Sequence, residues 1–153
     1  MTADAKSLIV AEKLGLDPDA EGIAVVDCGG KGGIELVVRV CRAMDIPFAV
    51  LHDEDVWRVE DIADEDKRKK QEKDNRDETQ KNQRIRNAIG SGAGLFVLRP
   101  SLEAVLGIAR DARDKPRRIA DALEGVDLEQ PPATLNALLD AVKAAMQDTN
   151  SRG

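Results

Sequence analysis

Two acidic residues, Asp53 and Asp55, directly follow a short apolar run and carry the strongest chemical signal in the chain. In an extended chain, residues two apart face the same side and lie roughly 6.5–7 Å from each other. This spacing suits one divalent ion in a curved loop, or two ions about 4 Å apart. Because carboxylates offer only oxygen ligands, they favour Mg²⁺, Mn²⁺ or Ca²⁺ over zinc. The competing interpretation is a polar strand end capped by solvated acids.

Ser101 and Glu103 follow the next apolar run along the chain. In a purely structural role, Ser101 is the N-cap of a helix and Glu103 lies in its first turn, where the helix dipole favours an acid. In a functional role, both side chains direct their oxygens into the same crevice as Asp53. The two roles are compatible, because a capped helix N-terminus can still present side chains to a site.

Other residues offer weaker signals. The glycine-rich turn 28–33 suits a phosphate cradle before a helix, or simply a flexible turn, and it lacks the P-loop pattern. His52 lies beside the acids, where it either assists metal binding and proton transfer or is structural. Lys115 either contacts a scissile phosphate or lies on the surface. Cys28 and Cys41 are expected to pack as small apolar residues.

The elements that must position these residues alternate between strand and helix. Short apolar runs predict strands at 23–27, 47–52 and 95–98, and helical spacing predicts helices at 5–14, 34–41, 101–107 and 115–124 and a last helix from about 135. This alternation predicts an α/β fold with a parallel sheet and right-handed crossovers. Ligands bind beyond the carboxyl ends of such strands, which selects 27–33, 53–55 and 99–103.

A segment from Asp64 to Arg84 has essentially no apolar side chain. It is expected to be either a solvated helix held by charge pairs four residues apart or a mobile excursion. Its basic run 67–70 is only a weak indication of nucleic-acid binding. We expect residues 1–125 to form one domain that contains this charged insertion or helix at 63–86, and residues 126–153 to form a C-terminal amphipathic helix and tail.

Composition excludes several classes of protein. The net charge of −6 argues against a protein held on nucleic acid by bulk positive charge, and an aromatic content of 2% argues against a base-stacking single-strand binder. No apolar run is long enough to span a membrane, and the N-terminus has no signal-peptide pattern. The two cysteines show neither metal-ligand spacing nor a disulfide framework. The chain is therefore expected to be a reduced, cytoplasmic protein.

Three stretches of sequence are informative when they are taken together. They are Val25–Lys31 (VVDCGGK) with the helix after it, Ile46–Asp55 (IPFAVLHDED) and Pro100–Glu103 (PSLE). Together they resemble the Toprim domain of the OLD-family (overcoming lysogenization defect) ATP-dependent nucleases, over roughly residues 5–125. The resemblance implies a Toprim-like, Rossmann-like fold and a metal-dependent endonuclease that hydrolyses phosphodiester bonds in DNA. It also implies Mg²⁺ or Mn²⁺, at one or two positions, bound by Asp53, Asp55, Ser101 and Glu103, with Lys115 assisting catalysis.

The chain also departs from that family. The family opens with a central strand ending in Glu-Gly, followed by a second acid, whereas this chain starts with Met1–Asp4 at what corresponds to the following helix. The family's ATPase domain is absent too, so an ATPase domain or subunit is an expected partner. We therefore expect a domain truncated at its N-terminus, with weak nuclease activity and a tendency to self-associate or form a homo-oligomer.

Two other functions fit part of the pattern. Asp53-x-Asp55-Val56 suits the nucleophile and acid of a haloacid-dehalogenase-like phosphatase, although that class needs a later acidic metal pair after a strand, and none is evident. A degenerate, non-catalytic interaction module is the second alternative, favoured by the missing first strand. Trapping with a phosphate analogue would identify the phosphatase, and failure to bind metal would favour the interaction module.

Overall fold

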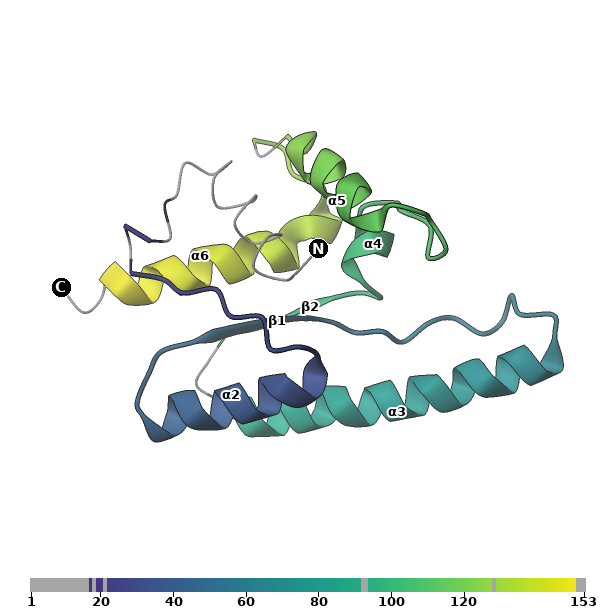
Figure 1. Cartoon of the computed structure of the whole chain (residues 1–153), viewed down its shortest axis with the longest axis horizontal. Helices are drawn as coiled ribbons and strands as arrows, with labels where there is room; N and C mark the ends of the chain where they lie inside the picture. Colours follow the sequence, from purple (N-terminus) through teal and green to yellow (C-terminus); the bar gives the residue numbers. More distant parts are fainter. Residues whose placement is uncertain (1–16, 18, 21, 92–93, 128, 151–153) are drawn as a thin grey trace.

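The computed structural model describes residues 17–150 except 18, 21, 92–93 and 128, and it describes side chains up to residue 144. The elements are α2 (Lys31–Ala43), β1 (Ala49–Asp53), α3 (Glu65–Ile89), β2 (Gly94–Leu98), α4 (Leu102–Val105), α5 (Lys115–Glu124), the 3₁₀ turn η1 (Ala133–Leu135) and α6 (Asn136–Asn150) (Figure 1). The helix expected at 5–14 lies outside the described residues.

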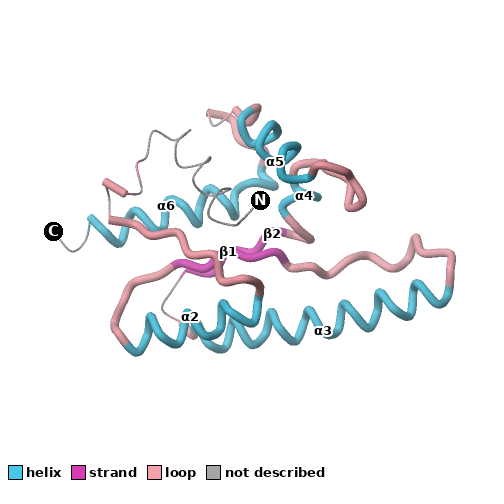
Figure 2. The backbone as a smooth tube through the Cα atoms, viewed as in Figure 1, coloured by secondary structure: helices cyan, strands magenta, loops and turns pink. Residues whose placement is uncertain are grey.

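The two strands lie side by side and run parallel, with Ala49 opposite Gly94 and Asp53 opposite Leu98 (Figure 2). Helix α3 is the long crossover between them. The Phe96 ring packs over Gly94, where an added Cβ would lie 2.7 Å from the ring and would force it to move. The prediction of an α/β fold with a parallel sheet is therefore confirmed, as is the helical C-terminal part.

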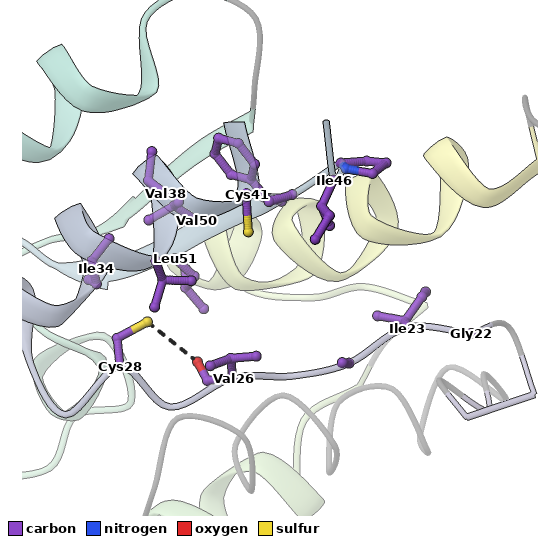
Figure 3. Close-up of a pocket in the computed structure, with 15 residues that line it drawn as sticks. Gly22, Ile23, Val26, Cys28, Ile34, Val38, Cys41, Ile46, Val50 and Leu51 are labelled. Atoms are coloured by element: carbon purple, nitrogen blue, oxygen red, sulfur yellow. Dashed lines mark hydrogen bonds between the residues drawn. The ribbon is translucent and has the colours of Figure 1, made fainter. Parts of the chain in front are cut away.

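The strand predicted at 23–27 is wrong. Residues 23–28 are irregular, and no backbone hydrogen bond joins them to β1 in the part of the chain that the structure describes. Instead, a hollow of about 540 Å³ lies between this segment and β1 (Figure 3). Apolar side chains such as Val26, Val38 and Leu51 line it. The run is also not buried, since Val26 is 58% exposed, and a strand needs a partner edge roughly 4.8 Å away.

Two apolar cores lie on opposite faces of the sheet. One joins α2 and α3 to β1 through Val38, Val50, Ile85 and Ile89. The other packs α4, α5 and α6 against β2, and its buried members are Leu98, Leu102, Ile119, Leu123, Leu135, Leu138 and Leu139. Figure 1 shows α2 and α3 below the strands and α6 above them. The strands are thus held between two helical layers, which fixes the edge at which they end.

Helix α3 forms from the charged segment, so the helical interpretation of residues 64–84 is confirmed. Asp64 caps it by accepting the Lys67 N–H at 3.0 Å. Charge pairs one turn apart, such as Lys69 with Glu65, lie along its surface. Its fully buried residues, Ile85 and Ile89, lie in the last turns. None of the helices in the described ranges is both long and apolar enough to cross a membrane.

The short helix α4 is the N-capped turn that the sequence predicts. The Ser101 hydroxyl accepts the Ala104 N–H at 3.4 Å. The predicted helix through Gly107 is shorter than expected, because α4 ends at Val105 and Gly107 adopts a φ of 71°. Helix α5 ends at Gly125 as predicted. These elements bring Ser101 to the carboxyl end of β2, next to the end of β1.

Candidate functional site

The site begins where β1 ends. The N–H of Glu54 donates to the Leu98 carbonyl and the N–H of Asp55 donates to the Pro100 carbonyl, both at 2.8 Å. Beyond the end of β1, the chain therefore remains hydrogen-bonded to the end of β2 and to the segment that follows it. Asp55 adopts a φ of 58°, so the backbone turns there. Both predicted acids, Asp53 and Asp55, lie at the carboxyl edge of the sheet, where ligands bind in α/β proteins.

Asp53 is fixed by the N-terminus of α4. Its Oδ1 accepts the N–H of Leu102 at 2.9 Å. Ser101, immediately before, is 4% exposed, and Glu103 is half-buried in the first turn of α4. The structure thus places the predicted Ser101–Glu103 turn directly against Asp53 through the Leu102 N–H. The capping role predicted for Ser101 is confirmed, and the ligand roles of Ser101 and Glu103 stay predictions.

A polar hollow of about 490 Å³ opens beside these acids. Its charged lining residues are Asp27, Lys31, Asp53, Asp55, Glu78 and Lys81. Neither Ser101 nor Glu103 borders it, and Lys115 lies elsewhere, at the start of α5. Within the described ranges, no three acidic, histidine or cysteine side chains converge closely enough to hold a metal ion. The four-ligand cage and the role of Lys115 therefore stay predictions.

Lys31 is a member of the site that sequence reasoning missed. Its ammonium lies 3.0 Å from Asp55 Oδ2 and 2.7 Å from Glu78 Oε2, and it donates to the Glu54 carbonyl at 2.8 Å. Its side chain is only 9% exposed. The available signal was its place in the glycine-rich turn at the carboxyl edge of the sheet, for which the sequence predicts a role only of the backbone N–H groups.

The glycines of that turn allow Lys31 to reach the site. Gly30 is the N-cap of α2 with a φ of 117°, and Asp27 Oδ1 accepts the N–H of Gly29 at 2.9 Å. Gly33 is required by close approach, because an added Cβ would lie 1.8 Å from the Cys28 carbonyl oxygen. The first turn of α2 is therefore pressed against the end of segment 23–28. Phosphate binding by this turn stays a prediction.

Glu78 is the second residue that the sequence did not reveal. It comes from the middle of α3, and it contacts both Lys31 and, at 2.6 Å, Lys81. Burial acts to raise the pKa of Glu78, but hydrogen bonds from Lys31 and Lys81 outweigh it and leave this pKa below its usual value. Glu78 is therefore a carboxylate at neutral pH and adds a negative charge to the hollow that already contains Asp53 and Asp55.

His52 lines the polar hollow beside the acids, and both of its predicted roles stay predictions. The residue is 7% exposed, and its Nδ1 lies 2.8 Å from the Asp53 carbonyl oxygen. Burial lowers the pKa of His52, against the effect of that hydrogen bond. A neutral ring that donates to the Asp53 carbonyl stiffens the end of β1. Among the cysteines, burial and the neighbouring Asp27 raise the pKa of Cys28, so its thiol stays protonated.

The donor set fits a hard divalent cation in its chemistry. Asp53, Asp55 and Glu78 line the hollow with carboxylate oxygens, the ligands that Mg²⁺ and Mn²⁺ prefer, but in the described part of the chain they do not converge on one point. Asn82 does not border the hollow; its Nδ2 donates to the same Glu54 carbonyl as Lys31, and its Oδ1 is buried without a hydrogen-bond partner. The place between Asp55 and Glu78 is held by the Lys31 ammonium. The cluster thus already binds one positive charge.

Comparison with known proteins gives two matches. Residues 5–55 match the model of the family described as overcoming lysogenization defect protein-like, TOPRIM domain. Over 137 residues, or 90% of the chain, the sequence is 56% identical to a Thermus scotoductus protein named OLD nuclease. The match covers 26% of that protein, so the chain spans about a quarter of its length. Both matches agree with the resemblance that the motifs indicated.

Proposed function

Because residues 5–55 of this chain are an OLD-like Toprim segment, we propose that the chain is the metal-dependent nuclease module of an OLD-type enzyme. Its reaction would be hydrolysis of phosphodiester bonds in DNA with Mg²⁺ or Mn²⁺. One observation carries the proposal: Asp53 and Asp55 lie at the carboxyl end of β1 and line one hollow with Asp27 and two lysines. An acidic hollow with ammonium groups at its wall suits a cation and a phosphate together.

Each residue has a role in this proposal. Asp53 and Asp55 hold the cation, and Ser101 and Glu103 complete its ligand set from the first turn of α4. The hydrogen bond from the Leu102 N–H orients Asp53 for this task. A divalent ion bound there supplies Lewis acidity toward the phosphate and lowers the pKa of water. Lys115 is proposed to offset charge, as the resemblance implies.

DNA is the proposed substrate, and we expect its phosphates to be bound only around the polar hollow. The chain has a net charge of −6, so attraction to phosphate depends on the cation and on lysines at the hollow rather than on the whole surface. The relative named OLD nuclease is much longer than the matched segment. We propose that this module acts with an ATPase domain or subunit, in agreement with the family resemblance.

Plasmid cleavage in Mn²⁺ tests the proposal with a matched pair of variants. Asp55→Asn removes one proposed ligand charge, and Asp45→Asn removes an acid outside the hollow. Both aspartates adopt positive φ, 58° and 53°, which asparagine tolerates. We expect Asp55→Asn to lower the nicking rate on the order of 100-fold and Asp45→Asn to leave it near wild type.

Equal nicking rates for the two variants would contradict the proposal, because the activity would then not depend on the acids at β1. Incubation with a phosphate analogue provides the second control. A trapped adduct on Asp53 would instead indicate the aspartyl-phosphate chemistry of a phosphatase. Absence of both metal binding and cleavage would favour the non-catalytic interaction module.

A further inference from the structure

The ammonium of Lys31 has three oxygen partners. It donates hydrogen bonds to Glu78 Oε2 at 2.7 Å and to the Glu54 carbonyl at 2.8 Å. It also forms an ion pair with Asp55 Oδ2 at 3.0 Å. These acceptors come from two segments 23 residues or more away along the chain. Lys31 therefore joins the start of α2, the end of β1 and the middle of α3 at one point.

We infer that Lys31 and a divalent cation are alternative partners of the Asp55–Glu78 pair, so that cation binding moves the Lys31 ammonium off these carboxylates. The inference rests on the proposed function, because it concerns the same cation site. It adds Glu78 to that site as a carboxylate from α3. It also gives Lys31 a defined role, which is to hold the pair together when no cation is bound.

Electrostatics makes simultaneous occupancy unfavourable. A divalent ion that contacts Asp55 would lie within a few ångströms of an ammonium on the same carboxylate, and like charges at such distances repel, most strongly on the side of Lys31, whose side chain is 9% exposed. Loss of the ammonium without replacement would leave two neighbouring carboxylates uncompensated, of which Glu78, at 21% exposure, is less solvated than Asp55, at 41%. Exchange of one cation for another avoids that cost.

After release from the carboxylates, the Lys31 ammonium can remain within the polar hollow. Lys31 lines the polar hollow next to Lys81, and its four-carbon stem lets the charged end move while the helix start stays fixed. Moved off Asp55, the ammonium remains at the wall of the same hollow. It would then offer a positive charge to a phosphate there. Lys31 is thus a positioning residue whose state reports on cation binding.

Chemical labelling of the wild-type chain tests this directly. An amine-acetylating reagent is applied with and without Mg²⁺, and the acetylation rate of each lysine is measured by mass spectrometry. We expect Lys31, which is 9% exposed, to react slowly without the ion and several-fold faster with it. Lys143, exposed on α6 and away from the hollow, is the internal control and should react at one rate throughout.

Calorimetry with Mn²⁺ gives a second measurement that does not depend on activity. Lys31→Met keeps the length of the side chain and removes its charge, so we expect Mn²⁺ to bind about fivefold or more tightly to this variant than to the wild type. Lys143→Met is the matched control and should bind as the wild type does. Glu78→Gln should weaken Mn²⁺ binding and, without metal, increase the acetylation of Lys31.

The outcomes separate the inference from the proposed function. If the wild type binds Mn²⁺ but Lys31 acetylation does not respond and Lys31→Met binds no more tightly, the inference is overturned and the nuclease proposal stands. If neither the wild type nor Lys31→Met binds Mn²⁺, both are overturned. Should Lys31→Met fail to fold, the labelling of the wild type decides the matter by itself.

Discussion

Asp53 ends β1, and its Oδ1 accepts the buried N–H of Leu102 at 2.9 Å. Asp53→Ala should therefore weaken Mn²⁺ binding and also destabilise the fold by about 1–3 kcal/mol, because the Leu102 N–H loses its acceptor. Asp53→Asn keeps an oxygen acceptor and should change stability by less than about 0.5 kcal/mol while still weakening Mn²⁺ binding. Calorimetry and urea denaturation measure the two effects. Equal Mn²⁺ heats for wild type and Asp53→Ala would remove Asp53 from the cation site.

Substitution of Glu103 tests whether this residue only stabilises the start of α4 or also binds the metal ion. If Glu103 only interacts with the helix dipole, Glu103→Gln should cost roughly 0.3–1 kcal/mol and leave metal binding unchanged. We expect weaker Mn²⁺ binding with stability unchanged or higher, because α4 spans only Leu102–Val105 and repulsion among carboxylates is relieved. Metal titration and denaturation of the variant decide between these results. A loss of stability without a loss of binding would make Glu103 a structural residue.

The sequence predicted the acids of the site better than their partners. Asp53 and Asp55 were found because they follow a strand, and strand ends meet at one edge of a parallel sheet. Glu78 could not be found in this way, because it lies within α3, a helix of 25 residues, and reaches the site only through the packing of α3 on α2. Lys31 was visible in the glycine-rich turn, but its contact with Glu78 spans 47 positions in the sequence.

At the scale of elements, α3 is held by polar contacts over much of its length. Asn75 accepts the N–H of Trp57 at 3.0 Å and donates to its carbonyl at 2.7 Å, and Arg110 lies 4.7 Å from the centre of the Trp57 ring. These contacts attach the segment after β1 to the helix. Because that segment includes Asp55, we expect the contacts to help hold Asp55 and Glu78 at a constant separation.

Asn75→Ala should release this segment. We expect a cost of roughly 1–2 kcal/mol for the two lost hydrogen bonds. Trp57 is the only tryptophan of the chain, so its fluorescence should shift to the red as the ring becomes more exposed. Asn87→Ala, at an exposed position of the same helix, is the control. If both variants have the wild-type spectrum and stability, Asn75 does not hold the segment.

Segment 23–28 shows how far an apolar pattern can predict an element. The pattern of alternating strands and helices correctly predicted α2, β1, β2, α5 and α6, and for α3 a helix was one of two alternatives. It failed at 23–27, because pairing depends on a neighbouring backbone that the local sequence does not specify. The segment still places Asp27 at the same hollow as Asp53 and Asp55. Its position, although not its hydrogen bonding, agrees with the prediction.

At the scale of the whole molecule, the sheet is narrow and one side of it is open. β1 pairs only with β2 in the described part, so its other edge faces the apolar hollow beside segment 23–28 (Figure 3). Helix α2 also presents Leu36, Val40 and Met44, four residues apart, to solvent. An unpaired strand edge and an exposed apolar stripe both favour association with another surface.

We therefore expect the chain to self-associate at concentrations in the micromolar range, as measured by light scattering after gel filtration. Leu36 and Met44 are 65% and 66% exposed, so replacing both with lysine should leave the fold intact. The double variant should shift the chain toward monomer, because two ammonium groups would have to be desolvated in the contact. Gln80→Lys, exposed on α3, adds the same kind of charge outside the stripe and should not change the oligomeric state. A wild-type chain that stays monomeric at all concentrations would show that the open edge and the apolar stripe need no partner.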